Sequence, residues 1–202
     1  LSTLRAMIAT PRPVDMHGLP GREEATGRGV AIIALKVLSR LNRRPQQTRI
    51  AIQGFGNVGG IAARIFRENG AKVIALQDAE ATVANPAGID VPAALVHVAA
   101  HGSLRGFFGA EPIGEDEFWH LECEYFVPAA LEGHVAPERV RGLQTNFVVA
   151  GAYGPITPAA DDILRDRYIL VIPDVLANAG GVTVSYFEWV QDFSSFFWTE
   201  EE

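Results

Sequence analysis

The stretch Arg49-Ile-Ala-Ile-Gln-Gly-Phe-Gly-Asn-Val-Gly59 decides the fold of this chain. It begins as a short apolar strand, breaks into glycines and continues as a helix, which we predict from Gly60 to Asn69. Gly54, Gly56 and Gly59 have the G-x-G-x-x-G spacing, in which the glycines allow a tight turn, the close approach of a pyrophosphate and close packing of helix on strand. The helix N-terminus would direct its N–H groups and positive dipole end at that phosphate.

The residues after this helix support a dinucleotide site. A second strand, Lys72 to Gln77, ends at Asp78, where an acid that bonds a ribose hydroxyl is expected. A plain βαβ unit with a glycine-rich turn is the alternative, because nearby glycines often mark only a loop. The strand–helix–strand context favours the dinucleotide interpretation. Asp78 favours NAD, since a carboxylate repels a 2′-phosphate, but NADP stays possible.

Bulk composition excludes several classes of protein. The chain has 202 residues, 48% of them hydrophobic and 20% charged, which is typical of a globular domain with a substantial core. The net charge of −7 and the lack of a basic run argue against a nucleic-acid partner. No apolar run is long enough for a membrane span. Cys123 is the only cysteine, so no intrachain disulfide and no cysteine metal cluster can form, and we expect a buried thiol in a cytoplasmic protein.

The rest of the chain alternates between helical and strand patterns. Apolar residues from Val30 to Leu41 recur with helical spacing, and a shorter helix is predicted from Val91 to Ala100. Further strands are predicted at 126–130, 147–152 and 169–174, with a helix between the last two. This alternation predicts an α/β, Rossmann-like fold: a mostly parallel, doubly wound sheet with helices on both faces.

The two ends of the chain differ from its middle. Residues 1–20 contain Pro11, Pro13 and Pro20 and are predicted to be a linker from a missing N-terminal substrate domain, followed by a dinucleotide-binding domain over 21–202. A final helix begins near Ala177 and continues into an aromatic-rich segment that reaches Trp198. These aromatic side chains need burial either against a partner surface or against the chain's own sheet, and the sequence does not decide between the two.

Five blocks resemble the cofactor domain of the glutamate/leucine/phenylalanine/valine dehydrogenase family, from about Thr10 to the end of the chain. The final block, which ends in Ser-Tyr-Phe-Glu-Trp, is similar to the glutamate branch. The leucine, phenylalanine and valine branches are the alternative within the family. The blocks are Gly21 to Gly29, Gln53 to Gly59, Pro128 to Glu132, Gly154-Pro155 with Thr157-Pro158, and Ile172 to Trp189.

The resemblance implies a role for each matched position. Thr26 resembles a threonine that contacts the nicotinamide amide, and Asn57 an asparagine that contacts the dinucleotide. Ser185 resembles the serine that bonds the distal carboxylate of the substrate, with Val182 one turn earlier. Purely structural roles are the alternatives: Thr26 as a helix cap, Asn178 as the support of a turn and Ser185 as a satisfied helix serine. The implied cofactor-binding set is Thr26, Gln53, Gly54, Phe55, Gly56, Asn57, Val58, Gly59, Asp78, Ala129, Ala130 and Asn178.

The resemblance also implies the reaction, which is the NAD- or NADP-dependent interconversion of glutamate with 2-oxoglutarate and ammonia, in a homo-oligomer that is hexameric in the full-length family. The family's lysine-bearing glycine loop is absent, since Lys36 and Lys72 lie in other contexts, and the usual C-terminal helices are missing too. We therefore expect no catalytic residue here and no activity from the chain alone. The rival is a non-catalytic or decayed module that binds dinucleotide or only assembles with other subunits. Ala150 and Tyr153 replace a family glutamate and asparagine, which puts cofactor affinity in question.

Overall fold

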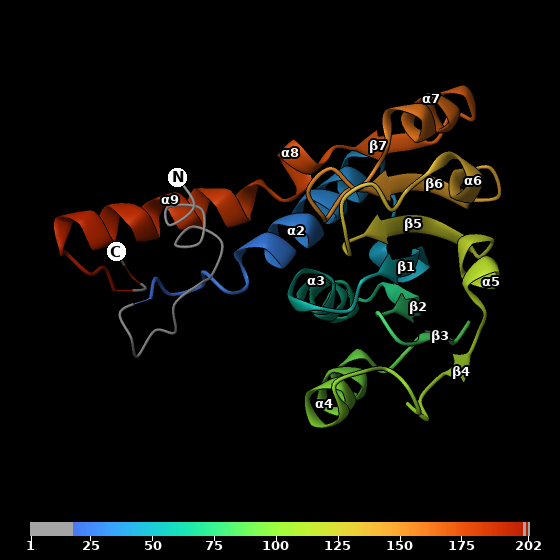
Figure 1. Ribbon diagram of the computed structural model, residues 1–202, viewed down its shortest axis with the longest axis horizontal. Helices are drawn as coiled ribbons and strands as arrows, with labels where there is room; N and C mark the ends of the chain where they lie inside the picture. Colours follow the sequence, from blue (N-terminus) through green and yellow to red (C-terminus); the bar gives the residue numbers. More distant parts are fainter. Residues whose placement is uncertain (1–17, 200, 202) are drawn as a thin grey trace.

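Strand β1 (Arg49–Gln53) lies in the middle of a seven-stranded sheet in a computed structural model that describes residues 18–199 and 201. It pairs in parallel with β2 (Lys72–Gln77) on one side and with β5 (Glu122–Pro128) on the other. The sheet order is β4-β3-β2-β1-β5-β6-β7 (Figure 1). The remaining strands are β3 (Thr82–Ala84), β4 (Glu111–Pro112), β6 (Gln144–Val149) and β7 (Leu170–Ile172).

The sheet is parallel except at one edge. Strands β6 and β7 continue the parallel arrangement beyond β5, whereas β3 and β4 run antiparallel next to β2. The prediction of a mostly parallel sheet is confirmed. The two antiparallel strands were not predicted, because they are only three and two residues long and carry no clear alternation.

Helices cover both faces, as predicted for a doubly wound sheet (Figure 1). On one face α2, α3 and α4 contribute to a buried cluster with Ile50 and Ile52 of β1. On the other face α5, α6 and α7 form a second cluster with Ala51. The helical segments are α2 (Ala25–Arg40), η2 (Pro45–Gln47), α3 (Asn57–Glu68), α4 (Val91–His101), α5 (Glu115–Trp119), α6 (Pro137–Val140), α7 (Pro158–Asp166), α8 (Asp174–Ala177) and α9 (Ala179–Ser194).

Two helices begin earlier than the sequence predicts. Helix α3 starts at Asn57, three residues before the predicted Gly60, so the glycine motif forms its first turn. Helix α2 starts at Ala25, which places Thr26 in its first turn. The first turns of both helices contain glycines, which have a low helix propensity and interrupt the apolar pattern. The pattern therefore placed the start of each helix too late. The third predicted strand also ends early, because β5 stops at Pro128 and leaves Ala129 and Ala130 in the following loop.

Small residues allow α2 to lie very close to its neighbours. A Cβ added to Gly27 would lie 2.6 Å from the carbonyl oxygen of Val58 in α3. A Cβ added to Gly180 would lie 2.6 Å from the carbonyl oxygen of Ala25. No real Cβ makes contacts this short, so larger residues would force the helices apart. The block from Gly21 to Gly29 therefore brings the start of α2 against the glycine motif.

Cys123 is buried on β5, as the sequence predicts. Burial raises the pKa of its thiol to about 11. Since the thiolate is the nucleophilic form, a raised pKa keeps this side chain unreactive near neutral pH. Cys123 is a core residue.

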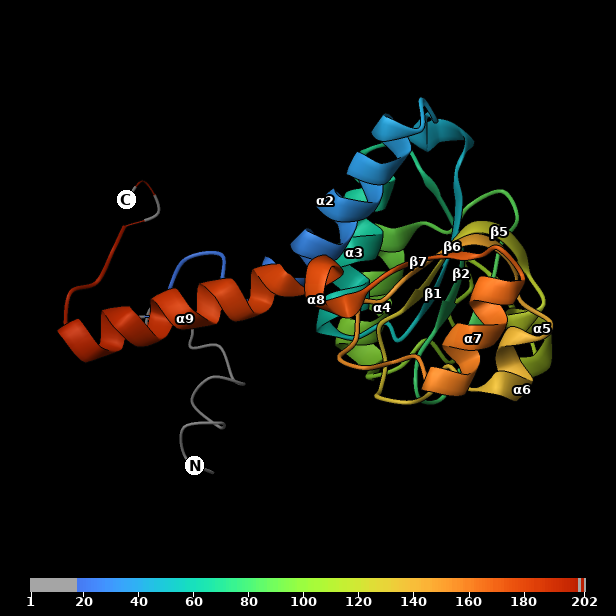
Figure 2. The same cartoon turned by 90° about the horizontal axis from the view of Figure 1, so that it is seen from above.

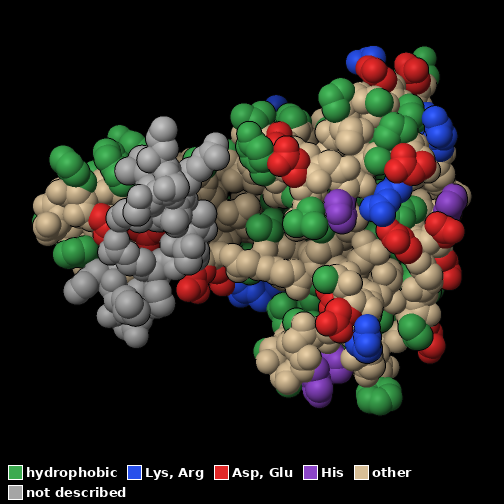
Figure 3. Space-filling model, in the orientation of Figure 1, with side chains coloured by type: hydrophobic (Ala, Val, Ile, Leu, Met, Phe, Trp, Pro, Cys, Tyr) green, Lys and Arg blue, Asp and Glu red, His purple; other side chains and the backbone are tan. Residues whose placement is uncertain are grey.

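Helix α9 projects away from the body of the molecule (Figure 2). Several of its aromatic side chains are exposed, and hydrophobic side chains gather toward its far end (Figure 3). The possibility that this aromatic run packs on the chain's own sheet is therefore wrong. The exposed aromatic residues of α9 and of the segment after it are Tyr186, Phe187, Trp189, Phe193, Phe196 and Phe197.

In the part of the chain that the structure describes, none of the helices combines the length and apolar character that a membrane span requires. The predicted linker over residues 1–20 lies almost entirely outside the described residues, which begin at Gly18.

Candidate functional site

The direction of chain connection reverses between β1 and β5. From β1 the chain passes to β2 on one side, and it later returns to β5 on the other side of β1. In open parallel sheets, ligands bind in the crevice at the carboxyl ends of two such strands. A cavity of about 540 Å³ lies at this point. It is lined by Arg22, Thr26, Asn57, Val58, Ala129, Ala130, Leu131, Glu132, Gly151, Ala152, Tyr153, Asn178, Gly181, Val182 and Ser185.

The glycine motif has the geometry that its spacing predicts. Gly54 has a φ of +91°, which makes the tight turn after β1, and a Cβ there would lie 2.7 Å from the backbone of Ala129. A Cβ on Gly59 would lie 1.8 Å from the Gly54 carbonyl oxygen, so helix and strand are in close contact. A Cβ on Gly56 would meet nothing within 4 Å. The space beside Gly56, next to the N-terminus of α3, fits a pyrophosphate.

The other residues of the motif point in different directions. Val58 lines the cavity, whereas Phe55 is buried in the core and Gln53 is buried at the end of β1. The Oε1 atom of Gln53 has no hydrogen-bond partner among the described residues. Neither Gln53 nor Phe55 lines the cavity, and their predicted contact with the cofactor stays a prediction.

Asn57 connects the glycine motif to the segment before α2. Its Nδ2 atom donates a hydrogen bond of 2.9 Å to the carbonyl oxygen of Glu23, and the residue also lines the cavity. Thr26 reaches the cavity from the first turn of α2. The alternative role of Thr26 as a helix cap is wrong, because the cap position is Glu24 and no side chain caps this helix.

Asn178 lies between α8 and α9 and donates a hydrogen bond of 3.1 Å from Nδ2 to the carbonyl oxygen of Ala152. This bond fixes the loop after β6 beside the cavity. The side chain of Asn178 thus supports a distant loop instead of the turn before Gly180, and a role toward a ligand stays a prediction. Tyr153 in the same loop is 79% exposed, so its ring lies at the rim.

Ser185 and Val182 line the cavity from α9, as their spacing of three residues predicts. Ser185 is only 4% exposed, and its hydroxyl donates a 2.7 Å hydrogen bond to the carbonyl oxygen of Gly181. The alternative of a satisfied helix serine therefore has a structural basis, and the contact with a substrate stays a prediction. Val182 is exposed.

Arg22 and Glu188 were not predicted as site residues. Arg22 lines the cavity and is 7% exposed, and its Nε atom lies 3.7 Å from Oε2 of Glu188, which is 4% exposed. The other carboxylate oxygen of Glu188 accepts a 3.3 Å hydrogen bond from the backbone of Leu19. The pair therefore connects the segment that precedes α2 with α9. The signal in the sequence was the single acid within the aromatic Tyr186-Phe-Glu-Trp189 segment.

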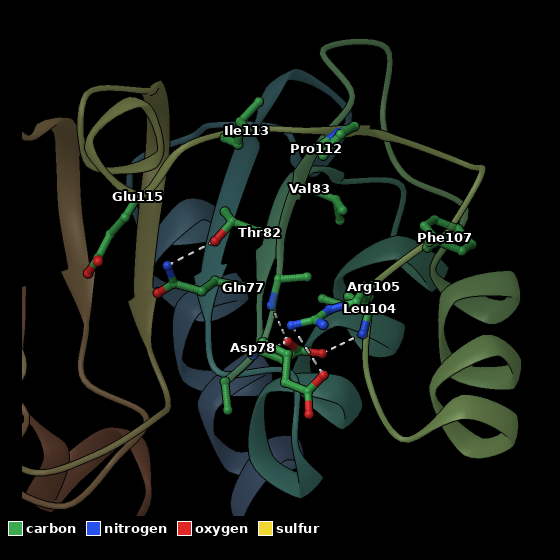
Figure 4. A pocket seen from close by; sticks show the side chains of 14 residues that line it. Gln77, Asp78, Thr82, Val83, Leu104, Arg105, Phe107, Pro112, Ile113 and Glu115 are labelled. Atoms are coloured by element: carbon green, nitrogen blue, oxygen red, sulfur yellow. Dashed lines mark hydrogen bonds and ion pairs between the residues drawn. The ribbon is translucent and has the colours of Figure 1, made fainter.

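Asp78 lies apart from this cavity, in the loop between β2 and β3. Its Oδ1 atom accepts 2.8 Å hydrogen bonds from the backbone of Glu80 and of Ala81, and Oδ2 accepts one of 2.5 Å from the backbone of Leu104. Asp78 lines a second cavity of about 490 Å³ instead (Figure 4). Its carboxylate thus has a structural role, and its predicted bond to a ribose hydroxyl is not tested by this geometry.

Comparison with known proteins places this site in a family. The model of the glutamate/leucine/phenylalanine/valine dehydrogenase family matches residues 18–202.

The chain belongs to this family.

Curated relatives and solved structures agree. The chain is 47% identical to glutamate dehydrogenase of Thermotoga maritima over 192 residues, which is 95% of this chain and 46% of the relative. It is 40% identical to NADP-specific glutamate dehydrogenase A1 of Halobacterium salinarum, over 96% of this chain and 47% of the relative. The crystal structure of hetero-hexameric glutamate dehydrogenase from Thermus thermophilus, in its leucine-bound form, superposes with a TM-score of 0.84 at 33% identity and covers 94% of this chain and 45% of that one.

The chain spans about half the length of the curated relatives it matches. It is homologous to glutamate dehydrogenases over that half, and the predicted family and fold class are confirmed.

Proposed function

We propose that this chain is the dinucleotide-binding domain of an NAD(P)-dependent glutamate dehydrogenase. The observation that supports this function best is the convergence of Thr26, Asn57, the Ala129-Ala130 pair, Asn178 and Ser185 on one cavity above the glycine motif. These residues come from four separate segments of the sequence. Their meeting at the topological switch point is what a nicotinamide dinucleotide requires.

The nicotinamide, when bound, supplies the hydride chemistry. The residues of this chain bind the dinucleotide and orient its nicotinamide ring and the substrate. The open space at Gly56 and the first turn of α3 receive the pyrophosphate, and Thr26 and Asn178 border the space for the ring. Arg22 is the cation in the described part of the cavity lining, and together with the hydroxyl of Ser185 it suits the distal carboxylate of glutamate or 2-oxoglutarate. Holding the substrate against the ring is the contribution of this domain to rate.

The acid–base groups for glutamate chemistry come from elsewhere in this proposal. Among the described cavity-lining residues there is no lysine, and both lysines of the chain are exposed, Lys36 on α2 and Lys72 on β2. We therefore expect these groups to lie in the half of the full-length relatives that this chain does not match. A homo-oligomer, hexameric when full-length, is part of the same proposal.

Direct titration tests the proposal. The purified 202-residue chain is titrated with NADH and with NADPH, and cofactor fluorescence is followed. Saturable binding of either cofactor is the expected result. Absence of binding to both would contradict the proposed function, and Tyr153 and Ala150 would be the first residues to revert toward the family pattern. The rival, a non-catalytic module, would be favoured if the chain binds the cofactor but no assembly that contains it turns over glutamate.

Ser185→Ala tests the substrate contact. In an enzyme reconstituted at full length, we expect kcat/KM for glutamate to fall roughly ten- to a hundredfold, because a hydrogen bond to a charged group is worth about 1.5–3 kcal/mol. NADH affinity should hardly change. The free energy of unfolding should fall by about 1 kcal/mol, because the variant loses the buried bond to the Gly181 carbonyl.

Thr183→Ala is the matched comparison. Its hydroxyl also bonds the carbonyl four residues earlier, that of Ala179, but Thr183 is exposed and does not line the cavity. If both variants lose only stability and keep the dependence on glutamate, Ser185 is a core residue and not a substrate contact.

A further inference from the structure

We propose that a third cavity, between α3 and α4, binds a small organic anion with an apolar body, of the class of aliphatic carboxylates. This cavity has a volume of about 600 Å³, and none of its lining residues lines either of the two cavities at the carboxyl ends of the strands. The inference therefore goes beyond the proposed function. The lining residues are Arg64, Arg67 and Glu68 of α3, Asp90 at the N-cap of α4, and Pro92, Leu95 and Val96 of α4.

The wall formed by α4 is apolar although it faces solvent. The helix reads Val-Pro-Ala-Ala-Leu-Val-His-Val-Ala-Ala-His and contains no Asp, Glu, Lys or Arg. A helix at the surface of a globular protein ordinarily carries charged or polar side chains on its outer face. Val96 is instead 70% exposed, beside the exposed Pro92 and the half-buried Leu95. The side chains of this wall offer contact area to an apolar group.

The other wall, formed by α3, is charged, and most charges around the cavity already have a partner. A guanidinium nitrogen of Arg64 lies 2.5 Å from Oε1 of Glu24, and another lies 3.8 Å from Oε1 of Glu68. The carboxylate of Asp90 accepts a 3.1 Å hydrogen bond from a backbone N–H in the first turn of α4 and so caps that helix. The two carboxylates of the lining are therefore engaged.

Arg67 is the exception among these charged groups. It is exposed in the last turn of α3, and its guanidinium makes no hydrogen bond or ion pair with any residue that the structure describes. Because a guanidinium presents its N–H donors in a fixed fork, it matches the two oxygens of a carboxylate. A carboxylate at Arg67, with its carbon chain along Leu95 and Val96, would satisfy both walls, and no existing ion pair would have to break.

Close packing of the two helices holds these walls in place. Helix α4 lies beside α3 (Figure 1), and a Cβ added to Gly60 of α3 would lie 3.1 Å from Cδ2 of Leu95. The side chain of Leu95 is therefore seated directly on the first turns of α3. A ligand would meet an apolar wall that is already formed, which lowers the entropic cost of binding.

Titration of the 202-residue chain with hexanoate, followed by 15N chemical shifts, tests the proposal. We expect saturable binding with a Kd of about 0.1–1 mM, because so small a ligand has few atoms to contribute. The largest shifts should lie at the amides of Arg67, Leu95 and Val96. Acetate lacks the apolar body and 1-hexanol lacks the charge, so each should bind at least about tenfold more weakly than hexanoate.

Two variants remove one wall each. Arg67→Gln should raise the Kd for hexanoate about tenfold, because it removes the charge that faces the carboxylate. Arg40→Gln is its control, since Arg40 is also an exposed arginine in the last turn of a helix, α2, and does not line the cavity. Val96→Asp should raise the Kd at least about tenfold, since it places a carboxylate on the apolar wall. Ala99→Asp, at an exposed position of α4 outside the lining, is the control for this variant.

Weakening by Arg67→Gln and by Val96→Asp, with a wild-type Kd in both controls, supports the proposal. A wild-type Kd in either of the two cavity variants would overturn it, because hexanoate would then bind elsewhere, and so would equal weakening by the controls. Absence of binding to the wild-type chain at concentrations up to about 10 mM would overturn it as well.

Discussion

Gly56→Val is expected to abolish dinucleotide binding, with an increase in Kd of more than about a hundredfold, while the domain stays folded. A Cβ at Gly56 meets no protein atom within 4 Å, so the valine side chain would occupy the space proposed for the pyrophosphate. The backbone permits the change, because Gly56 has a φ of −87°. Cofactor fluorescence measures the binding, and circular dichroism measures the fold.

Gly114→Val is a close match for this variant. Gly114 also occupies the N-cap position of a helix, α5, has a φ of −73° and has nothing within 4 Å of an added Cβ. Both variants lose a good N-cap residue and should lose about 1 kcal/mol or less of stability for that reason. Only Gly56→Val should lose NADH. Unchanged NADH affinity in that variant would show that the cofactor does not lie across the glycine motif.

Glu188→Ala should lower the free energy of unfolding by about 3–5 kcal/mol, the largest stability effect that we expect from a single side chain here. The substitution removes the acid that faces Arg22, whose Nε lies 3.7 Å from Oε2, and both side chains are almost fully buried. It removes the acidic partner of a buried guanidinium and the acceptor of the backbone N–H of Leu19. Urea unfolding gives the value directly.

A double variant distinguishes a buried charge from simple loss of packing. Arg22→Met with Glu188→Leu should recover most of the stability, because replacement of both charges by apolar groups of similar volume is often neutral. Asp162→Asn breaks an exposed ion pair on α7 and should cost less than about 1 kcal/mol. A cost of that same size for Glu188→Ala would mean that water screens the pair in solution.

Much of the fold could be predicted because its signals are local. The strand from Arg49 to Gln53, the glycines after it and the strand from Lys72 to Gln77 are read from consecutive residues, and the structure has both strands with these bounds. The glycine spacing alone also predicted that Gly56 is open and that Gly59 packs tightly. Helix starts were less predictable, since Gly27, Gly29 and Gly59 lie inside helices that tertiary packing stabilises against their low propensity.

The sequence by itself determined the βαβ unit, the alternation that leads to a doubly wound sheet, and the identity of most residues around the first cavity, because these follow from short-range periodicity and from motifs. Only the tertiary structure decided the strand order, the antiparallel edge and the burial of Ser185. It also decided that Asp78 binds backbone N–H groups and that Arg22 meets Glu188. Each of these depends on segments far apart in the chain, 166 residues apart for the Arg22–Glu188 pair, and a contact at that separation leaves no periodic trace in either segment.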